Sequence, residues 1–202
     1  MHLVLGLGNP GRRYEQTRHN VGFLVVDRLA ERHGVTCDRR QLGALVTSAE
    51  IEGQPAVLAK PQSFMNLSGQ PATSLRGFYK VEVDRVVVVH DEVDLPFGQV
   101  RVKLGGGHGG HNGLRDIAGK VGAGFTRVRV GVGRPPEGWN TADYVLAGFT
   151  SAEQGDLPDL VELAADAVTA VLTDGPTAAM NRFNTRPRQR DRAESGSDRA
   201  AD

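Results

Sequence analysis

Residues 85–94 have the sequence RVVVVHDEVD, and this stretch decides the fold class. Four consecutive valines favour a β-strand whose two faces are both covered, because a strand with one face in water alternates apolar and polar side chains. We therefore predict a strand from Arg85 to His90. The acidic residues that follow would lie at its carboxyl end, where ligand crevices form in open α/β sheets.

The rest of the chain alternates between strand and helix patterns on both sides of this stretch. Asn20 and Ser68 would cap the helices that begin beside them. The alternation predicts an α/β fold in which helices cover both faces of a mainly parallel or mixed sheet. Strands are predicted at residues 2–8, 44–51, 56–60, 99–103 and 126–132, and helices at residues 20–33, 69–79, 114–121, 151–172 and 176–184.

Length and composition indicate one globular domain. The chain has 202 residues, of which 39% are hydrophobic and 24% charged, and this suffices for one core. We assign residues 1–184 to the domain. Residues 185–202 hold five arginines, four acidic residues and almost nothing apolar, so we expect a mobile tail there. The longest apolar runs have four residues, so we expect no membrane segment and a cytoplasmic protein.

The charges balance overall but are separated along the chain. The 24 basic and 24 acidic residues give a net charge of zero, which alone argues against a strong nucleic-acid binder. Residues 95–134, however, hold seven basic residues and one acidic residue, whereas residues 135–184 hold one basic and eight acidic residues. The first segment would suit a partner that carries phosphates. The alternative is that both segments are solvated faces of unrelated elements.

The glycines of residues 6–11 (GLGNPG) match the letters of a dinucleotide-binding fingerprint. In such a site the helix begins within the glycine motif, so that its N-terminus meets the pyrophosphate. Residues 11–19 are polar and have no helical repeat, and the helix is predicted to begin only near Asn20. We therefore reject a nucleotide cofactor at this loop.

Two separated segments offer acid–base chemistry. His19 lies in a polar loop before a predicted helix, and an imidazole suits proton transfer because its ordinary pKa is about 6.5. Asp91, at the end of the valine strand, could bind one nitrogen of His19 so that the other faces a water molecule. The alternatives are that His19 is solvated or only a structural hydrogen-bonding residue, and that the acidic cluster binds Mg²⁺ or faces solvent.

Residues 105–113 (GGGHGGHNG), which we call the glycine loop, contain six glycines. Such a run lets the backbone approach a ligand closely, and its amides suit an anion. His108 and His111 also suggest zinc, but they lie three residues apart in a flexible loop without a cysteine pair, which disfavours a metal site. Asn66, between a predicted strand and a helix, offers a polar substrate both a donor and an acceptor.

Other functional classes lack their motifs. There is no Gly-x-Ser-x-Gly elbow of a serine hydrolase and no Gly-x-x-x-x-Gly-Lys-Ser/Thr loop of a nucleoside-triphosphate motor. The single cysteine, Cys37, excludes an internal disulfide. Aromatic residues make up 5% of the chain, too few for a platform that stacks bases, so contact with RNA would depend on phosphates and shape.

Together these segments resemble the bacterial peptidyl-tRNA hydrolase family, from about His2 to Asn184. The resemblance implies one α/β domain with a twisted mixed sheet, usually a monomer without an obligate protein partner, cofactor or metal. It also implies an esterase that cuts the bond between a peptide and the terminal ribose of tRNA, and so recycles tRNA from prematurely released chains. The motifs that carry it are Gly8-Asn9-Pro10-Gly11, Tyr14-x-x-Thr17-Arg18-His19-Asn20-x-Gly22, Phe64 through Gly69, His90 through Pro96 and Gly105 through Gly113.

The resemblance also implies roles for individual residues. His19 would accept a proton from the attacking water, and Asp91 would orient and stabilise His19. Asn9 is similar to the residue that distinguishes an N-blocked peptidyl group from a free aminoacyl group. Contacts with the substrate are implied for Tyr14, Phe64, Asn66, His111 and Asn112.

Ester hydrolysis needs an activated water, a donor to the developing oxyanion and a means of holding the carbonyl in line. The amides of Asn9, Asn66 or Asn112 could supply the last two, and the sequence does not choose among them. For the tRNA phosphates we predict contacts from the densest positive charge next to the glycine loop. These residues are Arg101, Lys103 and Arg129.

Two rival functions remain at this point. A binding module on the same fold, as in chloroplast RNA-splicing factors similar to this family, would have no evident need for a base. A metal-dependent phosphoesterase would use Asp91, His108 and His111. The presence of His19 and Asp91 together with Asn9 favours the hydrolase.

Overall fold

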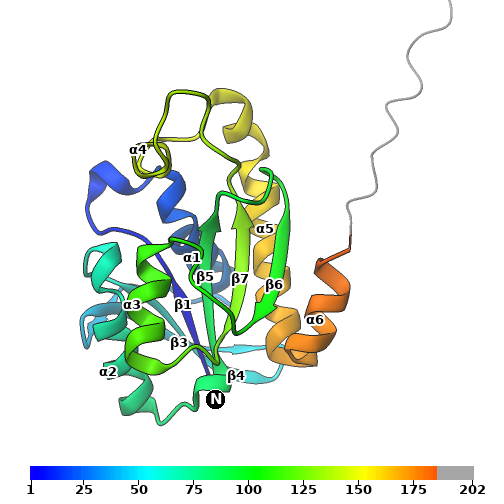
Figure 1. Cartoon of the computed structure of the whole chain (residues 1–202). Coiled ribbons are helices and arrows are strands. Elements are labelled where there is room, and N and C mark those ends of the chain that lie inside the picture. The colour runs from blue at the N-terminus through cyan, green and yellow to red at the C-terminus, as the bar shows by residue number, and fades with distance from the viewer. Residues whose placement is uncertain (186–202) are drawn as a thin grey trace, which may run out of the picture.

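A computed structural model describes residues 1–185 of the chain. In this part seven strands form one twisted mixed sheet in the order β2-β3-β4-β1-β5-β7-β6 (Figure 1). Strands β4, β1, β5 and β7 are parallel, while the pairs β2–β3, β3–β4 and β6–β7 are antiparallel. The strands are β1 (His2–Gly6), β2 (Arg39–Gln41), β3 (Ala44–Ile51), β4 (Gln54–Pro61), β5 (Val86–Glu92), β6 (Val100–Leu104) and β7 (Thr126–Gly131).

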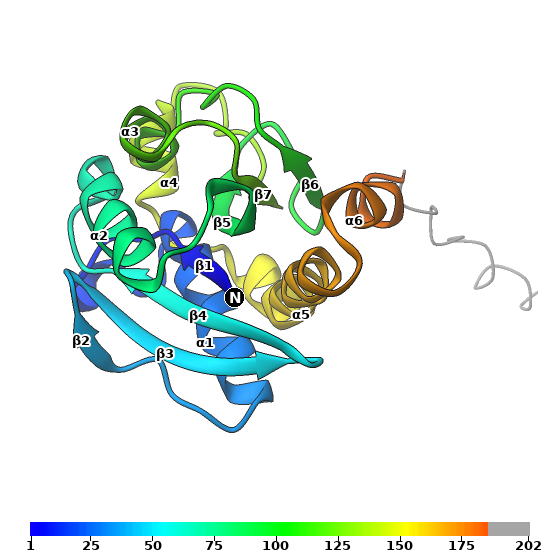
Figure 2. The same ribbon diagram turned by 90° about the horizontal axis from the view of Figure 1, so that it is seen from below.

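Helices cover both faces of the sheet, which confirms the predicted fold class. Figure 2 shows α2 and α3 on one side of β1 and β5, and α5 on the other. Each layer encloses its own apolar core. The first layer is α2 (Gly69–Tyr79) and α3 (Asn112–Val121), and the second is α1 (Val21–Arg32), α5 (Ser151–Asp174) and α6 (Pro176–Phe183).

The valines of β5 divide between these two cores, as the sequence pattern predicts. Val87 and Val89 belong to the core under α1 and α5, while Val86 and Val88 belong to the core under α2 and α3. All four are at most 1% exposed. The strand therefore has no face in water, and its polar residues, His90 to Glu92, are confined to its carboxyl end, where they still pair with β7.

Helix α1 lies very close to β1 because Gly6 and Gly22 face each other. A Cβ atom on Gly6 would overlap the carbonyl oxygen of Gly22. One on Gly22 would lie 2.5 Å from both the Leu7 amide nitrogen and the Val89 carbonyl oxygen. The glycines of this region therefore serve helix–strand packing. They bring the residues just before α1, including His19, to the carboxyl ends of β1 and β5.

The two predicted helix caps are wrong. The side chain of Asn20 makes no bond to the first turn of α1 and bonds to the backbone of Asn9 instead. Ser68 has helical backbone angles, and its buried hydroxyl donates back to the Met65 carbonyl at 2.7 Å. In both places a 3₁₀ turn, at residues 18–20 and 65–67, leads directly into the helix, so the preceding residue lacks the extended backbone of a cap.

Two short elements, β2 and α4 (Thr141–Val145), are not predicted by the sequence pattern. They have three and five residues, which is too few for a periodic signal. No helix within residues 1–185 is long and apolar enough to cross a bilayer. Apart from Thr185, the predicted tail lies outside the described residues.

Candidate active site

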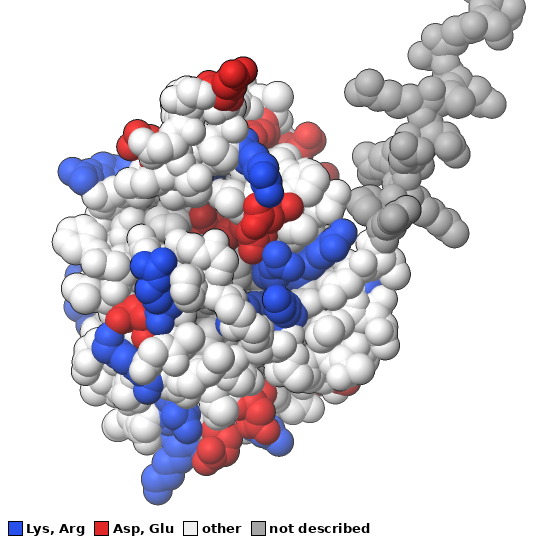
Figure 3. Space-filling view, viewed as in Figure 1, with Lys and Arg blue, Asp and Glu red and all other residues white. Residues whose placement is uncertain are grey.

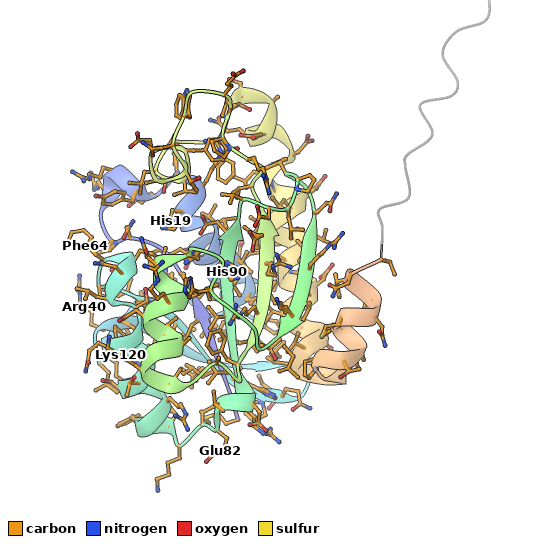
Figure 4. All side chains as sticks on the ribbon, in the orientation of Figure 1. His19, Arg40, Phe64, Glu82, His90 and Lys120 are labelled. Atoms are coloured by element: carbon orange, nitrogen blue, oxygen red, sulfur yellow. The ribbon has the colours of Figure 1, made fainter. Side chains whose placement is uncertain are left out.

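A cavity of about 700 Å³ lies at the carboxyl ends of the central strands. Figure 4 shows the labelled His19 above His90, with Phe64 to one side. The wall combines segments that are far apart in the sequence, so the fold assembles it from five of the regions singled out above. Seven predicted site residues line it: Asn9, His19, Phe64, Asn66, Asp91, His111 and Asn112.

His19 and Asp91 meet in this cavity, as predicted from the two separate motifs. The Nδ1 atom of His19 lies 2.9 Å from each carboxylate oxygen of Asp91. The Asp91 side chain is 2% exposed and that of His19 12%. Because Asp91 is acceptor only, Nδ1 carries the proton, and the unprotonated Nε2 remains available on the cavity side.

The charges of the pair adjust the pKa of both groups. Burial opposes protonation of His19, but the negative charge of Asp91 and its hydrogen bond outweigh burial and raise the pKa of His19. Burial also disfavours ionised Asp91, yet the attraction of His19 and His111 holds its pKa well below the ordinary range. Asp91 is therefore a permanent carboxylate, and it makes His19 a stronger base than a free imidazole.

His111 is a second partner of Asp91. Its Nε2 lies 2.9 Å from Asp91 Oδ1, while its Nδ1 accepts the backbone N–H groups of Gly113 at 3.2 Å and Leu114 at 3.3 Å. His111 thus caps α3, and this cap fixes its tautomer with the proton on Nε2. Both ring nitrogens are engaged within the protein, so only ring carbons are left for the predicted substrate contact.

His90 is a third, buried histidine beside this pair, and it contacts Asp91 and His111. It is 1% exposed, and its Nδ1 donates to the carbonyl of Asp91 at 2.7 Å. Its ring meets the ring of His111 edge-on, with centroids 5.0 Å apart. Burial, with repulsion from His111, lowers the pKa of His90 to about 3. Of the three clustered histidines, His19 is the one arranged to take up a proton at neutral pH.

Asn9 presents an amide of fixed orientation to the cavity. Its backbone N–H donates to Asn20 Oδ1 at 2.8 Å, and its carbonyl accepts Asn20 Nδ2 at 2.9 Å. Its side-chain Oδ1 accepts the Met65 N–H at 2.8 Å. This last bond decides which end of the amide is oxygen, so the NH₂ group remains as the donor at the cavity wall.

The other predicted substrate-binding residues lie at the mouth of the cavity or beside it. Asn66, Asn112 and Phe64 are exposed on its wall, and Phe64 is 58% exposed. The structure does not place Tyr14 on the wall. Its hydroxyl accepts a hydrogen bond from Arg13, whose guanidinium lies over the Tyr14 ring.

Arg18 anchors the His19 loop, a role that the sequence reasoning missed. It is 4% exposed, its Nη1 donates to the Gly148 carbonyl at 2.7 Å, and its Nη2 forms an ion pair with Glu153 at 2.9 Å. The guanidinium also lies 4.1 Å from the ring centroid of Tyr144. The position of Arg18 between Thr17 and His19 in the motif was the available signal.

The three predicted phosphate-binding residues share one face of β6 and β7. Arg101 pairs with Arg129 across these strands, and Lys103 follows two residues along β6. Figure 3 shows basic side chains gathered over β6 and β7 beside an acidic group. Arg129 donates to Glu92 at 3.1 Å, and Glu92 lines the cavity. The basic face therefore begins at the rim of the site, with part of its charge already paired.

A shared metal ion does not suit this arrangement. His19, Asp91 and His111 hold donor atoms close enough for an ion. However, the Nε2 proton of His111, which the cap at Nδ1 requires, occupies the position of the lone pair that a metal would need. His108 lines the cavity, but its Nδ1 accepts the Gly110 N–H at 3.1 Å. The donor set fits a hydrogen-bonded group better than a metal centre.

Comparisons with known proteins give a consistent result. The family model described as Peptidyl-tRNA hydrolase matches residues 3–192. A peptidyl-tRNA hydrolase of Frankia casuarinae is 54% identical over 183 residues, which cover 90% of this chain and 93% of that protein. One of Leifsonia xyli subsp. xyli is 54% identical over 186 residues, which cover 91% of this chain and 96% of that protein. The crystal structure of peptidyl-tRNA hydrolase from Acinetobacter baumannii matches with a TM-score of 0.85 and 38% identity, over 91% of this chain and 94% of that one.

Proposed function

The chain belongs to the peptidyl-tRNA hydrolase family, and from this premise we propose that it cleaves the ester bond of peptidyl-tRNA with a water activated by His19. Peptidyl-tRNA hydrolysis is the function that the family match and the relatives support. The products are a free peptide and a tRNA that returns to aminoacylation. The observation that carries the mechanism is the Nδ1 atom of His19 within 2.9 Å of the buried Asp91 carboxylate.

His19 is the general base in this mechanism. Its Nε2 removes a proton from a water molecule as the oxygen attacks the ester carbonyl carbon. Asp91 keeps the Nδ1 proton in place, so that the correct nitrogen faces the water, and it stabilises the imidazolium that forms. The same proton then passes to the ribose oxygen as the ester bond breaks, which returns His19 to its neutral state.

Asn9 is the residue best suited to hold the ester carbonyl. The bond from Met65 N–H fixes its amide, so the NH₂ group needs no reorientation as negative charge develops on the carbonyl oxygen. Asn66 and Asn112, which are exposed at the mouth, suit main-chain amides of the peptide or the terminal nucleotide. Phe64 offers an apolar contact there.

The face of Arg101, Lys103 and Arg129 suits the phosphates of the tRNA acceptor stem. These side chains lie beside the cavity on one face of the sheet. Phosphate contacts carry no sequence information, which fits an enzyme whose substrates share a backbone rather than a sequence. We also assign the reaction to a monomer in the cytoplasm that needs no metal, cofactor or obligate protein partner.

Hydrolysis of N-acetyl-phenylalanyl-tRNA tests this proposal directly. We expect turnover by the wild-type protein, persistence of turnover in excess EDTA and a loss of about three orders of magnitude or more in kcat for His19→Ala. Loss of activity in EDTA would indicate that a metal ion, and not His19, activates the water. Binding of the substrate without turnover would favour the RNA-binding module. A sedimentation experiment on the free protein checks the monomer.

A further inference from the structure

Arg127 of β7 is a buried charged residue that the proposed mechanism does not use. It is 2% exposed, and within residues 1–185 it forms no ion pair with a carboxylate. Burial, together with repulsion from Arg129, lowers the pKa of Arg127. Burying a charge without an opposite charge is costly. A residue kept at this cost needs an explanation other than the stability of the sheet.

Both hydrogen bonds of the Arg127 side chain go to the glycine loop. Its two terminal nitrogens donate to the carbonyls of Gly106 and Gly107. On its other side, the guanidinium carbon lies 5.0 Å from the ring centroid of Phe125, which is fully buried. The planar guanidinium therefore packs against an aromatic ring of the core and donates hydrogen bonds to two successive carbonyls of the loop.

The glycine loop has little stiffness of its own. Four of its glycines have φ angles in the left-handed region, between 57° and 97°. Glycine pays the largest backbone entropy for being held in one conformation. The loop is tied to the sheet at its start by the Gly105 N–H, which donates to the Phe125 carbonyl at 3.0 Å. At residues 106 and 107 the bonds to the sheet come from Arg127.

The far half of the same loop forms part of the candidate site. Residues 108–112 line the cavity. His111 bonds to Asp91 from there, and Asn112 lies at the mouth. A loop released at residues 106 and 107 would let His111 move away from Asp91 and would reshape the wall that faces the substrate.

We propose that Arg127 is a positioning residue: it fixes the glycine loop to β7 and thereby holds His111 and Asn112 where the reaction needs them. The role rests on the proposed function, since it serves that same site. Arg127 itself is too buried to reach a phosphate, so its effect is transmitted through the loop. This distinguishes it from Arg129 and Lys103 on the same sheet face, which reach solvent.

The test uses two substitutions and a matched control in the full-length protein. Arg127→Met keeps the length and apolar stem but removes all donors, whereas Arg127→Lys keeps the charge and one donor group. The control is Arg76→Met, which removes another arginine-to-carbonyl bond, from Arg76 Nε to Val81 at 3.0 Å, at the end of α2 and outside the cavity wall. For each protein we would measure kcat and KM for N-acetyl-phenylalanyl-tRNA, amide hydrogen exchange of residues 105–113, and Tm.

We expect Arg127→Met to lower kcat by roughly 100-fold and to speed exchange in the glycine loop, because misplaced groups lose alignment with the reacting bond. Arg127→Lys should recover part of both losses, and Arg76→Met should change neither. The salt dependence of KM should stay as in the wild type.

Two results would overturn the proposal. One is a fall in the Tm of Arg127→Met while its kcat and loop exchange stay at wild-type values, because this result would mean that Arg127 serves only the stability of the fold. The other is an unchanged kcat with a flatter salt dependence of KM, which would make Arg127 a phosphate ligand. If the wild type itself does not hydrolyse the substrate, the proposed function fails. Loop exchange in Arg127→Met still decides whether the arginine holds the loop.

Discussion

Asp91 is the residue around which the site is organised. It accepts hydrogen bonds from two histidines at 2.9 Å, and the carbonyl of the same residue accepts from a third. The three rings differ in what they can do, because burial lowers the pKa of His90 and both ring nitrogens of His111 are engaged, one with Asp91 and the other with the first turn of α3. One carboxylate therefore stabilises one new positive charge, on His19. This arrangement confines the proton to the group that faces the cavity.

Asn9 allows a substitution that separates its two functions. In Asn9→Asp the remaining oxygen can still accept the Met65 N–H, but the NH₂ donor becomes a carboxylate oxygen. We expect kcat/KM to fall by about 10²–10³ while Tm stays near the wild-type value, because a lost donor to a developing oxyanion costs this much. Asn9→Ala removes both groups and should lower the activity and the Tm. Wild-type turnover in Asn9→Asp would remove Asn9 from the reaction.

At the scale of elements, the contact between α1 and β1 positions the loop that carries His19. The Cβ atom of Gly22→Ala would meet backbone atoms of Leu7 and Val89, which cannot move without disturbing the sheet. We expect the substitution to lower the free energy of unfolding by about 1–3 kcal/mol and to reduce kcat by shifting the His19 loop. Chemical denaturation together with turnover of the folded protein would measure both effects.

Helix α2 provides the control for this substitution. A Cβ atom on Gly77 would have nothing within 4 Å, so Gly77→Ala should raise the free energy of unfolding by about 0.5–1 kcal/mol and leave kcat unchanged. If the two alanine variants behave alike, the close approach of α1 and β1 does not position His19.

At the scale of the whole molecule, net charge conceals a local basic face. Lys103 is exposed and forms no ion pair in the described part of the chain, whereas Arg129 is paired with Glu92. We therefore expect Lys103→Gln to raise KM and to flatten its dependence on salt by about one phosphate contact, and Arg129→Gln to have a smaller effect. In both, kcat should stay close to the wild-type value. A salt dependence equal to that of the wild type would place tRNA on another face.

The outline of the molecule and the pairing of His19 with Asp91 were accessible from the sequence. The four valines of β5 identify a strand covered on both faces, and the end of such a strand is where Asp91 lies. The polar loop before α1 identifies His19. These inferences work because strand and helix patterns are local, and because the carboxyl ends of parallel strands share one edge of the sheet.

The roles that depend on tertiary register were not accessible. Nothing local indicates that His111 caps a helix with one nitrogen and bonds Asp91 with the other. Arg127 is one of the seven basic residues of residues 95–134, and the sequence does not indicate that it is buried and bonds to the glycine loop. Asn20 is a residue type that is common at helix N-caps, but its side chain bonds to the backbone of Asn9. This contact depends on how β1 and α1 pack.

The pairing of His19 with Asp91 is the central feature of the proposed mechanism. An NMR titration of the His19 ring in the wild type and in Asp91→Asn tests it. Burial lowers the pKa of His19, whereas the charge of Asp91 raises this pKa above the ordinary value of 6.5. Removal of the Asp91 charge therefore leaves the effect of burial unopposed. We predict a midpoint above 6.5 in the wild type, matched by a rise of kcat/KM with pH through the same value. In Asp91→Asn we predict a midpoint below 6.5 and a large loss of kcat. A His19 midpoint that is the same in both proteins would contradict the account.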